Sequence, residues 1–259
     1  SKKLVFYILE NDLKLQSAKK AINFINSEIN LLTLPAWDCI PYDRLSPHRD
    51  IISKRIKTIS FLVENVNEIR NKIIRPTIIL ITINSWLQKI PPKNFYLDNS
   101  LLIQKNSELK FRDLQNYLIQ NGYERRNTVR EYGEFSIRGD IVDIFSSNEF
   151  NPVRIDFFDD FVERIRDFDP ISQITSKELK NVNLKPAFEY ILNEKAIKFF
   201  RQSYLQSFGG KSSKDHIYIS VSNGKPYPGL EHFLNFFHKK LFELEEIFSD
   251  IPKIFDYDL

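Results

Sequence analysis

The most regular pattern of hydrophobic and polar positions lies between Glu131 and Thr175. Apolar and polar residues alternate there one by one, which is the period of strands with one buried and one exposed face. The alternation is interrupted at Arg138-Gly139-Asp140, at 146–152 and at Asp159-Asp160, where turn-forming residues gather. The pattern predicts an antiparallel meander.

One face of this meander has an unusual composition. In the strand expected at 153–158, alternation turns Val153, Ile155 and Phe157 to the core and the residues between them to water. The residues predicted to face outward include Arg138, Arg154, Asp156 and Phe158. Arginine beside an exposed aromatic residue is typical of protein-interface hot spots. A structural interpretation is also open, in which Phe158 covers the hairpin turn and both arginines pair with carboxylates such as Asp156 and Asp159.

The first third of the chain follows another pattern. Continuous apolar runs suit strands that are buried on both faces, and segments with a helical period separate them. The expected elements are strands at 4–9, 29–34 and 77–83 and helices at 12–28, 50–65 and 85–90, the last ended by Pro91-Pro92. Strands that alternate with helices predict a parallel sheet covered on both sides.

Two further parts follow from about residue 99. A strand at 101–104 and a helix at 110–121, with Ser107 as its candidate N-cap, precede the meander. After Pro186 the helical period returns, first across 196–208 and then across 229–246. The sequence thus predicts an α/β protein with a smaller α/β module between two helical or parallel-sheet parts.

Composition narrows the class of protein. The 259 residues carry 37 Lys and Arg against 34 Asp and Glu, a net charge of +3 spread along the chain, which supports DNA binding only weakly. The single Cys39 excludes an internal disulfide and fits a reducing cytoplasm. Neither a membrane-spanning apolar run nor a signal-peptide pattern is found, so we expect a cytoplasmic protein without a membrane partner.

Several separated motifs are distinctive in this sequence. They are Leu34-Pro35-Ala36-Trp37-Asp38, Pro41-Tyr42-Asp43-Arg44-Leu45-Ser46-Pro47, 131–140, 154–169, Pro186-Ala187-Phe188-Glu189 and Gly229-Leu230-Glu231-His232-Phe233-Leu234. Together and in this order they resemble the N-terminal, UvrB-like region of bacterial transcription-repair coupling factors. The resemblance covers nearly the whole chain.

The resemblance implies a particular domain organisation. Residues 1–98 and 187–259 would form one discontinuous parallel-sheet domain, built like the core of a P-loop NTPase. Residues 99–186 would form an inserted small α/β domain that contains the meander and docks onto UvrA. The first domain is degenerate because no G-x-x-x-x-G-K-[ST] phosphate loop occurs in the sequence.

The nearest approach to a phosphate loop is Gly209-Gly210-Lys211-Ser212, but Leu205 occupies the place of the earlier glycine. It also follows a helical stretch rather than a strand, so we interpret it as a helix C-cap and loop. We therefore expect no catalysis and no bound cofactor in this chain.

By resemblance, the chain is an adaptor that recruits UvrA to RNA polymerase stalled at DNA lesions. Arg138, Arg154 and Phe158 fall on the positions that resemble the UvrA-docking surface of the family. The full-length protein would be an ATP-dependent DNA translocase that uses ATP and Mg and also binds RNA polymerase and duplex DNA.

Other interpretations remain open. Arg138, Arg154 and nearby lysines could contact phosphates in a nucleic-acid-binding fragment. The ATPase UvrB is a third candidate, against which the missing phosphate loop argues. Asp156, Asp159 and Asp160 are more often turn formers than metal ligands, and the four histidines are scattered, so we expect no metal site.

Overall fold

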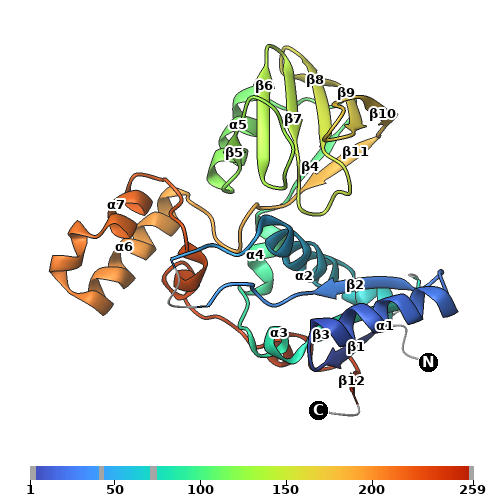
Figure 1. Ribbon diagram of the computed structural model, residues 1–259. Coiled ribbons are helices and arrows are strands. Elements are labelled where there is room, and N and C mark those ends of the chain that lie inside the picture. Colours follow the sequence, from blue (N-terminus) through green and yellow to red (C-terminus); the bar gives the residue numbers. More distant parts are fainter. Residues whose placement is uncertain (1–3, 41–43, 71–74, 257–259) are drawn as a thin grey trace.

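The computed structural model describes residues 4–40, 44–70 and 75–256, with 66–70 described by backbone only, and Figure 1 shows their arrangement. The motif residues Pro41-Tyr42-Asp43 lie outside these ranges. Within them the architecture is mixed α/β, with a four-stranded parallel sheet, a six-stranded sheet and a two-stranded antiparallel sheet. The predicted α/β class and the parallel sheet are therefore confirmed.

The parallel sheet is built from both ends of the described chain. Its strands are β1 (Leu4–Leu9), β2 (Asn30–Leu34), β3 (Thr77–Thr82) and β12 (Lys253–Phe255). They lie in the order β12-β1-β3-β2, and β12 pairs with β1 in parallel. A strand from the C-terminal part thus completes a sheet begun at the N-terminal part (Figure 1).

Helices cover both faces of this sheet, and adjacent positions of β3, such as Ile79, Leu80 and Ile81, are therefore all buried. Leu15 of α1 (Asp12–Ile25) packs against Leu9 and Leu80 on one face. On the other face, α2 (Arg49–Arg70) contributes Ile59 and Leu62 to a larger core. That core also holds residues of α3 (Ile83–Leu87), α4 (Lys93–Asp98) and α8 (Leu244–Phe248).

The middle of the chain forms the six-stranded sheet. Its order is β10-β9-β8-β7-β6-β5, and all neighbouring pairs are antiparallel except β5 with β6. The strands are β5 (Glu124–Arg125), β6 (Glu134–Arg138), β7 (Ile141–Ile144), β8 (Val153–Phe158), β9 (Phe161–Phe168) and β10 (Thr175–Glu178). The predicted meander is confirmed, with its turns at the three predicted interruptions.

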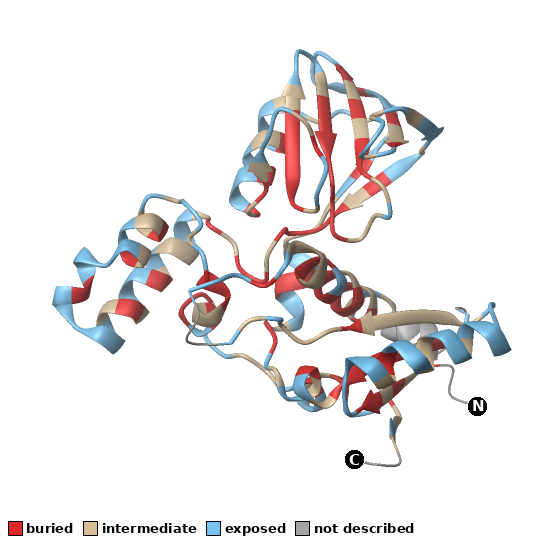
Figure 2. Cartoon of the chain, viewed as in Figure 1, coloured by how far each residue is buried: buried red, intermediate tan, exposed pale blue. Residues whose placement is uncertain are grey.

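One face of the six-stranded sheet is covered and forms the core of this part. The cover consists of α5 (Phe111–Gln120) and the antiparallel pair of β4 (Leu101–Gln104) and β11 (Asn181–Leu184). Figure 2 shows that β6 and β7 are mostly buried, whereas buried and more exposed positions alternate along β8.

The predicted N-cap of α5 is wrong. The Ser107 hydroxyl donates to the carbonyl of Gln104, and Lys110 is the residue that precedes the helix. The backbone N–H of Phe111 donates instead to Oδ1 of Asp160 at 3.0 Å. A carboxylate from the β8–β9 turn thus accepts the hydrogen bond that an N-cap residue of α5 would otherwise accept. Because Asp160 is distant in the sequence, the residues around α5 did not predict this contact.

Residues 193–225, called the helical lobe, follow β11 in the chain. The lobe contains α6 (Glu194–Phe208), a 3-10 turn η1 (Gly210–Lys214) and α7 (His216–Ser222). Gly209 ends α6 as predicted, and Lys211 lies in η1, which is not a phosphate loop.

The predicted helical stretch at 229–246 is not one helix. It comprises a 3-10 segment η2 (Leu230–Phe236) and the start of the separate helix α8. Phe233 has φ −109° and ψ 20°, which lies outside the helical range and interrupts the turn. Leu230, Leu234 and Phe237 are buried at helical spacing, and that spacing produced the wrong prediction.

Polar contacts join the parallel-sheet part to the six-stranded part. The Ser53 hydroxyl of α2 donates to the carbonyl of Ser147 at 3.1 Å, and Arg49 Nη1 donates to the carbonyl of Tyr132 at 3.1 Å.

Across the described residues, no helix is both long and apolar enough to cross a bilayer.

Candidate partner-binding surface

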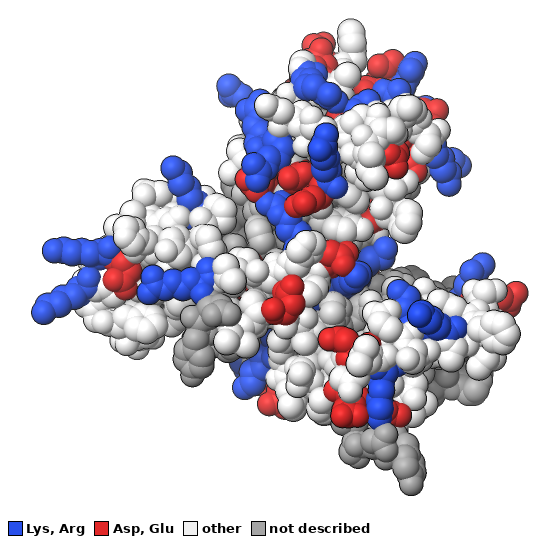
Figure 3. Space-filling view, in the orientation of Figure 1, with Lys and Arg blue, Asp and Glu red and all other residues white. Residues whose placement is uncertain are grey.

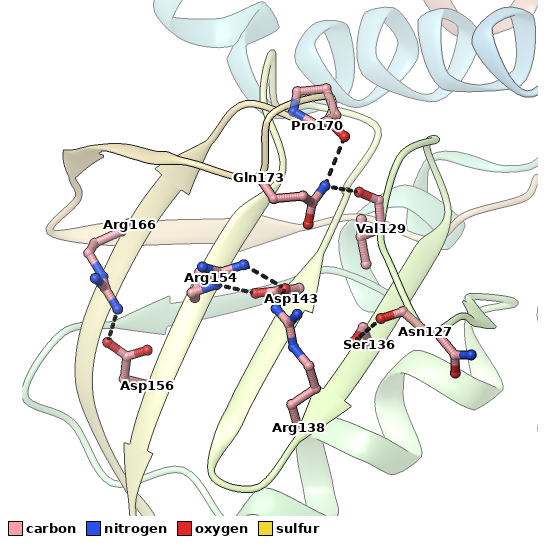
Figure 4. A network of polar contacts seen from close by, with 10 residues as sticks. All are labelled: Asn127, Val129, Ser136, Arg138, Asp143, Arg154, Asp156, Arg166, Pro170 and Gln173. Carbon is pink, nitrogen blue, oxygen red and sulfur yellow. Dashed lines mark hydrogen bonds and ion pairs between the residues drawn. The ribbon is translucent and has the colours of Figure 1, made fainter.

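The face of the six-stranded sheet opposite α5, here called the meander face, carries a cluster of charged side chains. Register places Asp143 of β7 opposite Ser136 of β6 and opposite Arg154 of β8. In Figure 4, the side chains of Arg138 and Arg154 converge on Asp143 from the strands on either side. The sheet therefore brings together two arginines that are 16 positions apart in the sequence.

Asp143 is bonded to both arginines. Arg154 donates from Nε to Oδ1 at 2.7 Å and from Nη2 to Oδ2 at 3.0 Å, while Arg138 donates from Nη2 to Oδ2 at 2.5 Å. The Asp143 side chain is only 1% exposed. A buried carboxylate with two guanidinium partners is fully engaged, and the paired geometry fixes the plane of the Arg154 guanidinium.

Arg154 is also held from its other side. Its guanidinium carbon lies 4.9 Å from the ring centre of Phe168, which belongs to a small buried cluster with Val129 and Phe145. The hydrogen bonds to Asp143 raise the pKa of the Arg154 guanidinium above its ordinary value, and the negative charge of Asp143 acts in the same direction. Arg154 is therefore held in one orientation, and only a small part of its side chain is exposed.

Arg138 and Phe158 are more open to solvent. The Arg138 side chain is 50% exposed and uses one guanidinium nitrogen for Asp143, so other donors remain available. Phe158, the last residue of β8, is 71% exposed. The backbone N–H of Phe157 donates to the carbonyl of Asp140, which holds the end of β8 beside the turn that follows Arg138.

A second exposed aromatic residue adjoins Phe158. Register pairs Phe158 with Phe161 across the β8–β9 turn, and Phe161 is 44% exposed. The turn between them has Asp159 at φ 51°. The two rings make this corner of the meander face apolar, and pairing across a two-residue turn was the signal that could have identified Phe161 from the sequence.

The structural interpretation of the arginines is correct in kind but names the wrong carboxylates. Both arginines do pair with a carboxylate, but it is Asp143 rather than Asp156 or Asp159. Asp156 pairs with Arg166 of β9 (Figure 4). Asp143 was missed because it lies on a short strand with few polar positions, and only the sheet register shows which residues face it.

The described part of the chain shows no cluster of metal-ligating side chains. No group of three or more His, Cys, Asp and Glu side chains is gathered there in a way that could hold a metal ion. The composition of the meander face suits contact with a partner. It has fixed hydrogen-bond donors beside an exposed aromatic corner, and nothing in it resembles a nucleophile with a base.

Comparison with known proteins gives a consistent set of relatives. The family model described as the UvrB interaction domain matches residues 101–190, which include all of β6 to β9. The transcription-repair-coupling factor of Rickettsia bellii is 33% identical over 242 residues, covering 93% of this chain and 21% of that protein. The transcription-repair-coupling factor of Escherichia coli is 32% identical over 222 residues, which cover 86% of this chain and 18% of that protein. The chain therefore spans about a fifth of the length of the curated relatives it matches.

Proposed function

Because this chain belongs to the transcription-repair-coupling factor family, we propose that it is the adaptor region that recruits UvrA to RNA polymerase stalled at DNA lesions. The observation that carries the proposal is the meander face, which lies within the residues matched as a UvrB interaction domain. Its side chains suit contact with a protein surface.

Three residues form the proposed UvrA contact. Phe158 offers an apolar ring that is largely exposed, and burying it in a pocket of the partner would release water. Arg138 has free donors for a carboxylate or carbonyl group of the partner. Arg154 is already oriented by Asp143 and Phe168, so little conformational entropy is lost when it binds.

This adaptor region would then be one part of a larger protein. We propose an ATP-dependent DNA translocase that binds RNA polymerase and duplex DNA, with ATP and Mg held outside this chain. The parallel sheet would be a P-loop-NTPase-like domain without the phosphate loop, with its discontinuity supported by the pairing of β12 with β1. Domain limits at 98/99 and 186/187 remain predictions.

Binding of purified UvrA to this chain tests the proposal. Phe158→Ala and Arg138→Ala should each weaken binding by about thirtyfold, which corresponds to about 2 kcal/mol. Arg154→Lys keeps the charge but loses the paired geometry, so we expect an intermediate loss. Calorimetric titration gives the affinities, and circular dichroism checks that each variant stays folded.

Matched controls lie in the same part of the chain. Phe150 is 85% exposed in the loop before β8, at the opposite end of that strand from Phe158. Arg112 is exposed on α5, on the other side of the sheet. Phe150→Ala and Arg112→Ala should bind UvrA like the wild type. Undiminished binding by folded Phe158→Ala and Arg138→Ala would refute the site, and failure of the wild type to bind would refute the adaptor function.

The nucleic-acid interpretation of Arg138 and Arg154 predicts a different salt response. Phosphate contacts weaken steeply as salt rises, because counterions are released on binding. The meander face supports this interpretation less well because Asp143 lies between the arginines and neutralises part of their charge. Affinity for UvrA that changes little between 50 and 200 mM salt, within about threefold, favours the protein interface.

A further inference from the structure

The helical lobe, residues 193–225, carries an excess of positive charge. This segment contains six Lys and Arg and two carboxylates, so its formal charge of +4 exceeds the +3 of the whole chain. Figure 3 shows Lys and Arg side chains projecting from the lobe around α6 and α7, with little acidic surface beside them. The rest of the chain is close to neutral by comparison.

The lysines of this lobe have no carboxylate partners in the described part of the protein. Several basic side chains elsewhere are paired, as in Arg154 with Asp143, Arg166 with Asp156 and Lys253 with Glu245. Lys195 and Lys198 are exposed and take part in no ion pair among the described residues. Unpaired cations on one face attract an anionic ligand.

A groove of about 490 Å³ runs between α4 and α6 along this charged edge. Lys195 and Lys198 line it from α6, and Lys239, which follows η2, lines it from another segment. Like the other two, Lys239 is exposed and lacks an ion-pair partner among the described residues. Asp98 is the one carboxylate in the lining. Three lysines thus converge on a concave surface from two parts of the chain.

The other residues that line the groove suit contact with nucleotide bases. Phe199 is partly exposed in the groove, and a base can stack on such a ring whatever its identity. The amides of Asn94 and Gln202 also line the groove and offer both donors and acceptors. Lys195 and Lys198 are three residues apart on one helix, so their Cβ atoms are about 5–6 Å apart, which lets both follow one flexible strand.

We propose that this groove binds single-stranded nucleic acid, with Lys195, Lys198 and Lys239 on the phosphates and Phe199 against a base. The site is separate from the meander face and does not depend on UvrA binding. An acidic peptide would use the lysines but leave Phe199 and the amides without a role. A duplex keeps its bases stacked inside, so it would not use the ring.

Fluorescence anisotropy with a labelled oligo-dT probe tests the inference on the complete chain. Three lysine–phosphate contacts on a single strand predict that log K falls with log salt with a slope of about −2. Lys195→Ala/Lys198→Ala leaves one contact and should reduce the slope to about −0.7. Phe199→Leu keeps the residue apolar and should weaken binding by about fivefold or more without changing the slope, because stacking is lost and charge is not.

The lobe supplies a control of equal charge. Lys211→Ala/Lys214→Ala removes two exposed lysines of η1 that do not line the groove, and it should retain the wild-type slope. Equal losses in both double variants would refute the groove and leave only diffuse attraction. Tighter binding of a duplex of the same length, or full competition by poly-glutamate at equal charge concentration, would also refute the proposal.

Discussion

Arg55 and Glu189 are 134 positions apart in the chain and form an ion pair closed to solvent, with side chains 0% and 2% exposed. Arg55 donates from Nε and Nη2 to the two carboxylate oxygens, each at 3.3 Å. Its Nη1 donates to the carbonyl of Pro35 at 3.0 Å and to Oε1 of Gln88 at 2.9 Å. The pair ties α2 to the segment that follows β11.

Loss of one partner of this pair should be costly. Glu189→Gln leaves the Arg55 charge buried without a counterion, so we expect a loss of about 3–5 kcal/mol in the free energy of unfolding. Urea denaturation measures it. Glu178→Gln, which breaks the exposed pair of Glu178 with Lys105, serves as the control and should leave the midpoint unchanged. Equal midpoints for all three proteins would contradict the prediction.

Asp143 should influence partner binding without touching the partner. Asp143→Asn keeps the shape of the side chain but removes the charge that orients Arg138 and Arg154. We expect UvrA binding about tenfold weaker, together with a loss of about 1–3 kcal/mol in stability. Ser176→Ala, which removes a hydrogen bond to Asp167 at the exposed end of the sheet, is the control. Wild-type affinity in folded Asp143→Asn would show that the arginines need no such support.

Glu231 should make stability depend on pH. Burial raises the pKa of its carboxyl from 4.5 to about 7. Oε2 accepts from the Ser46 hydroxyl at 2.8 Å, and Oε1 has no hydrogen-bond partner in the described part of the chain. The folded state retains a proton that the unfolded chain releases near pH 4.5. The stabilisation is therefore complete below pH 4.5 and declines by about 3 kcal/mol as pH rises to 7.

Glu231→Gln isolates this contribution, because the amide stays neutral at every pH. The difference in unfolding free energy between variant and wild type should shift in favour of the variant between pH 4.5 and 7, then stay level. Thermal unfolding across this range measures it. Parallel curves for the two proteins would mean that the Glu231 carboxyl titrates near its ordinary pKa.

Alanine substitutions at Gly229 and Gly139 distinguish the cost of backbone strain from the cost of a steric conflict. Both have positive φ, 79° and 59°, so alanine at either site costs about 1 kcal/mol or more. A Cβ at Gly229 would lie 3.2 Å from the backbone carbon of Arg44, whereas one at Gly139 would meet nothing within 4 Å. Gly229→Ala should therefore be less stable than Gly139→Ala by about 1–3 kcal/mol. Chemical denaturation compares them, and equal losses would exclude the conflict with Arg44.

Local sequence patterns were sufficient to predict which strand residues are buried and the type of most elements. Alternation along 153–158 separated Val153, Ile155 and Phe157 from the outward residues, and β8 has this burial pattern. Apolar runs separated by helical periods predicted the parallel sheet. These features are local, because a residue's face in a strand or helix depends on its neighbours one to four positions away.

Which side chains contact one another depends on the three-dimensional arrangement of the chain. Asp143 became the partner of Arg138 and Arg154 through strand register, and Asp160 reached the start of α5 from a distant turn. Lys239 came to lie opposite α6 through the course of the chain after η2, the segment whose helical spacing was misleading. Such contacts depend on long-range packing and register, which leave no periodic trace in the sequence because the partners are far apart along the chain.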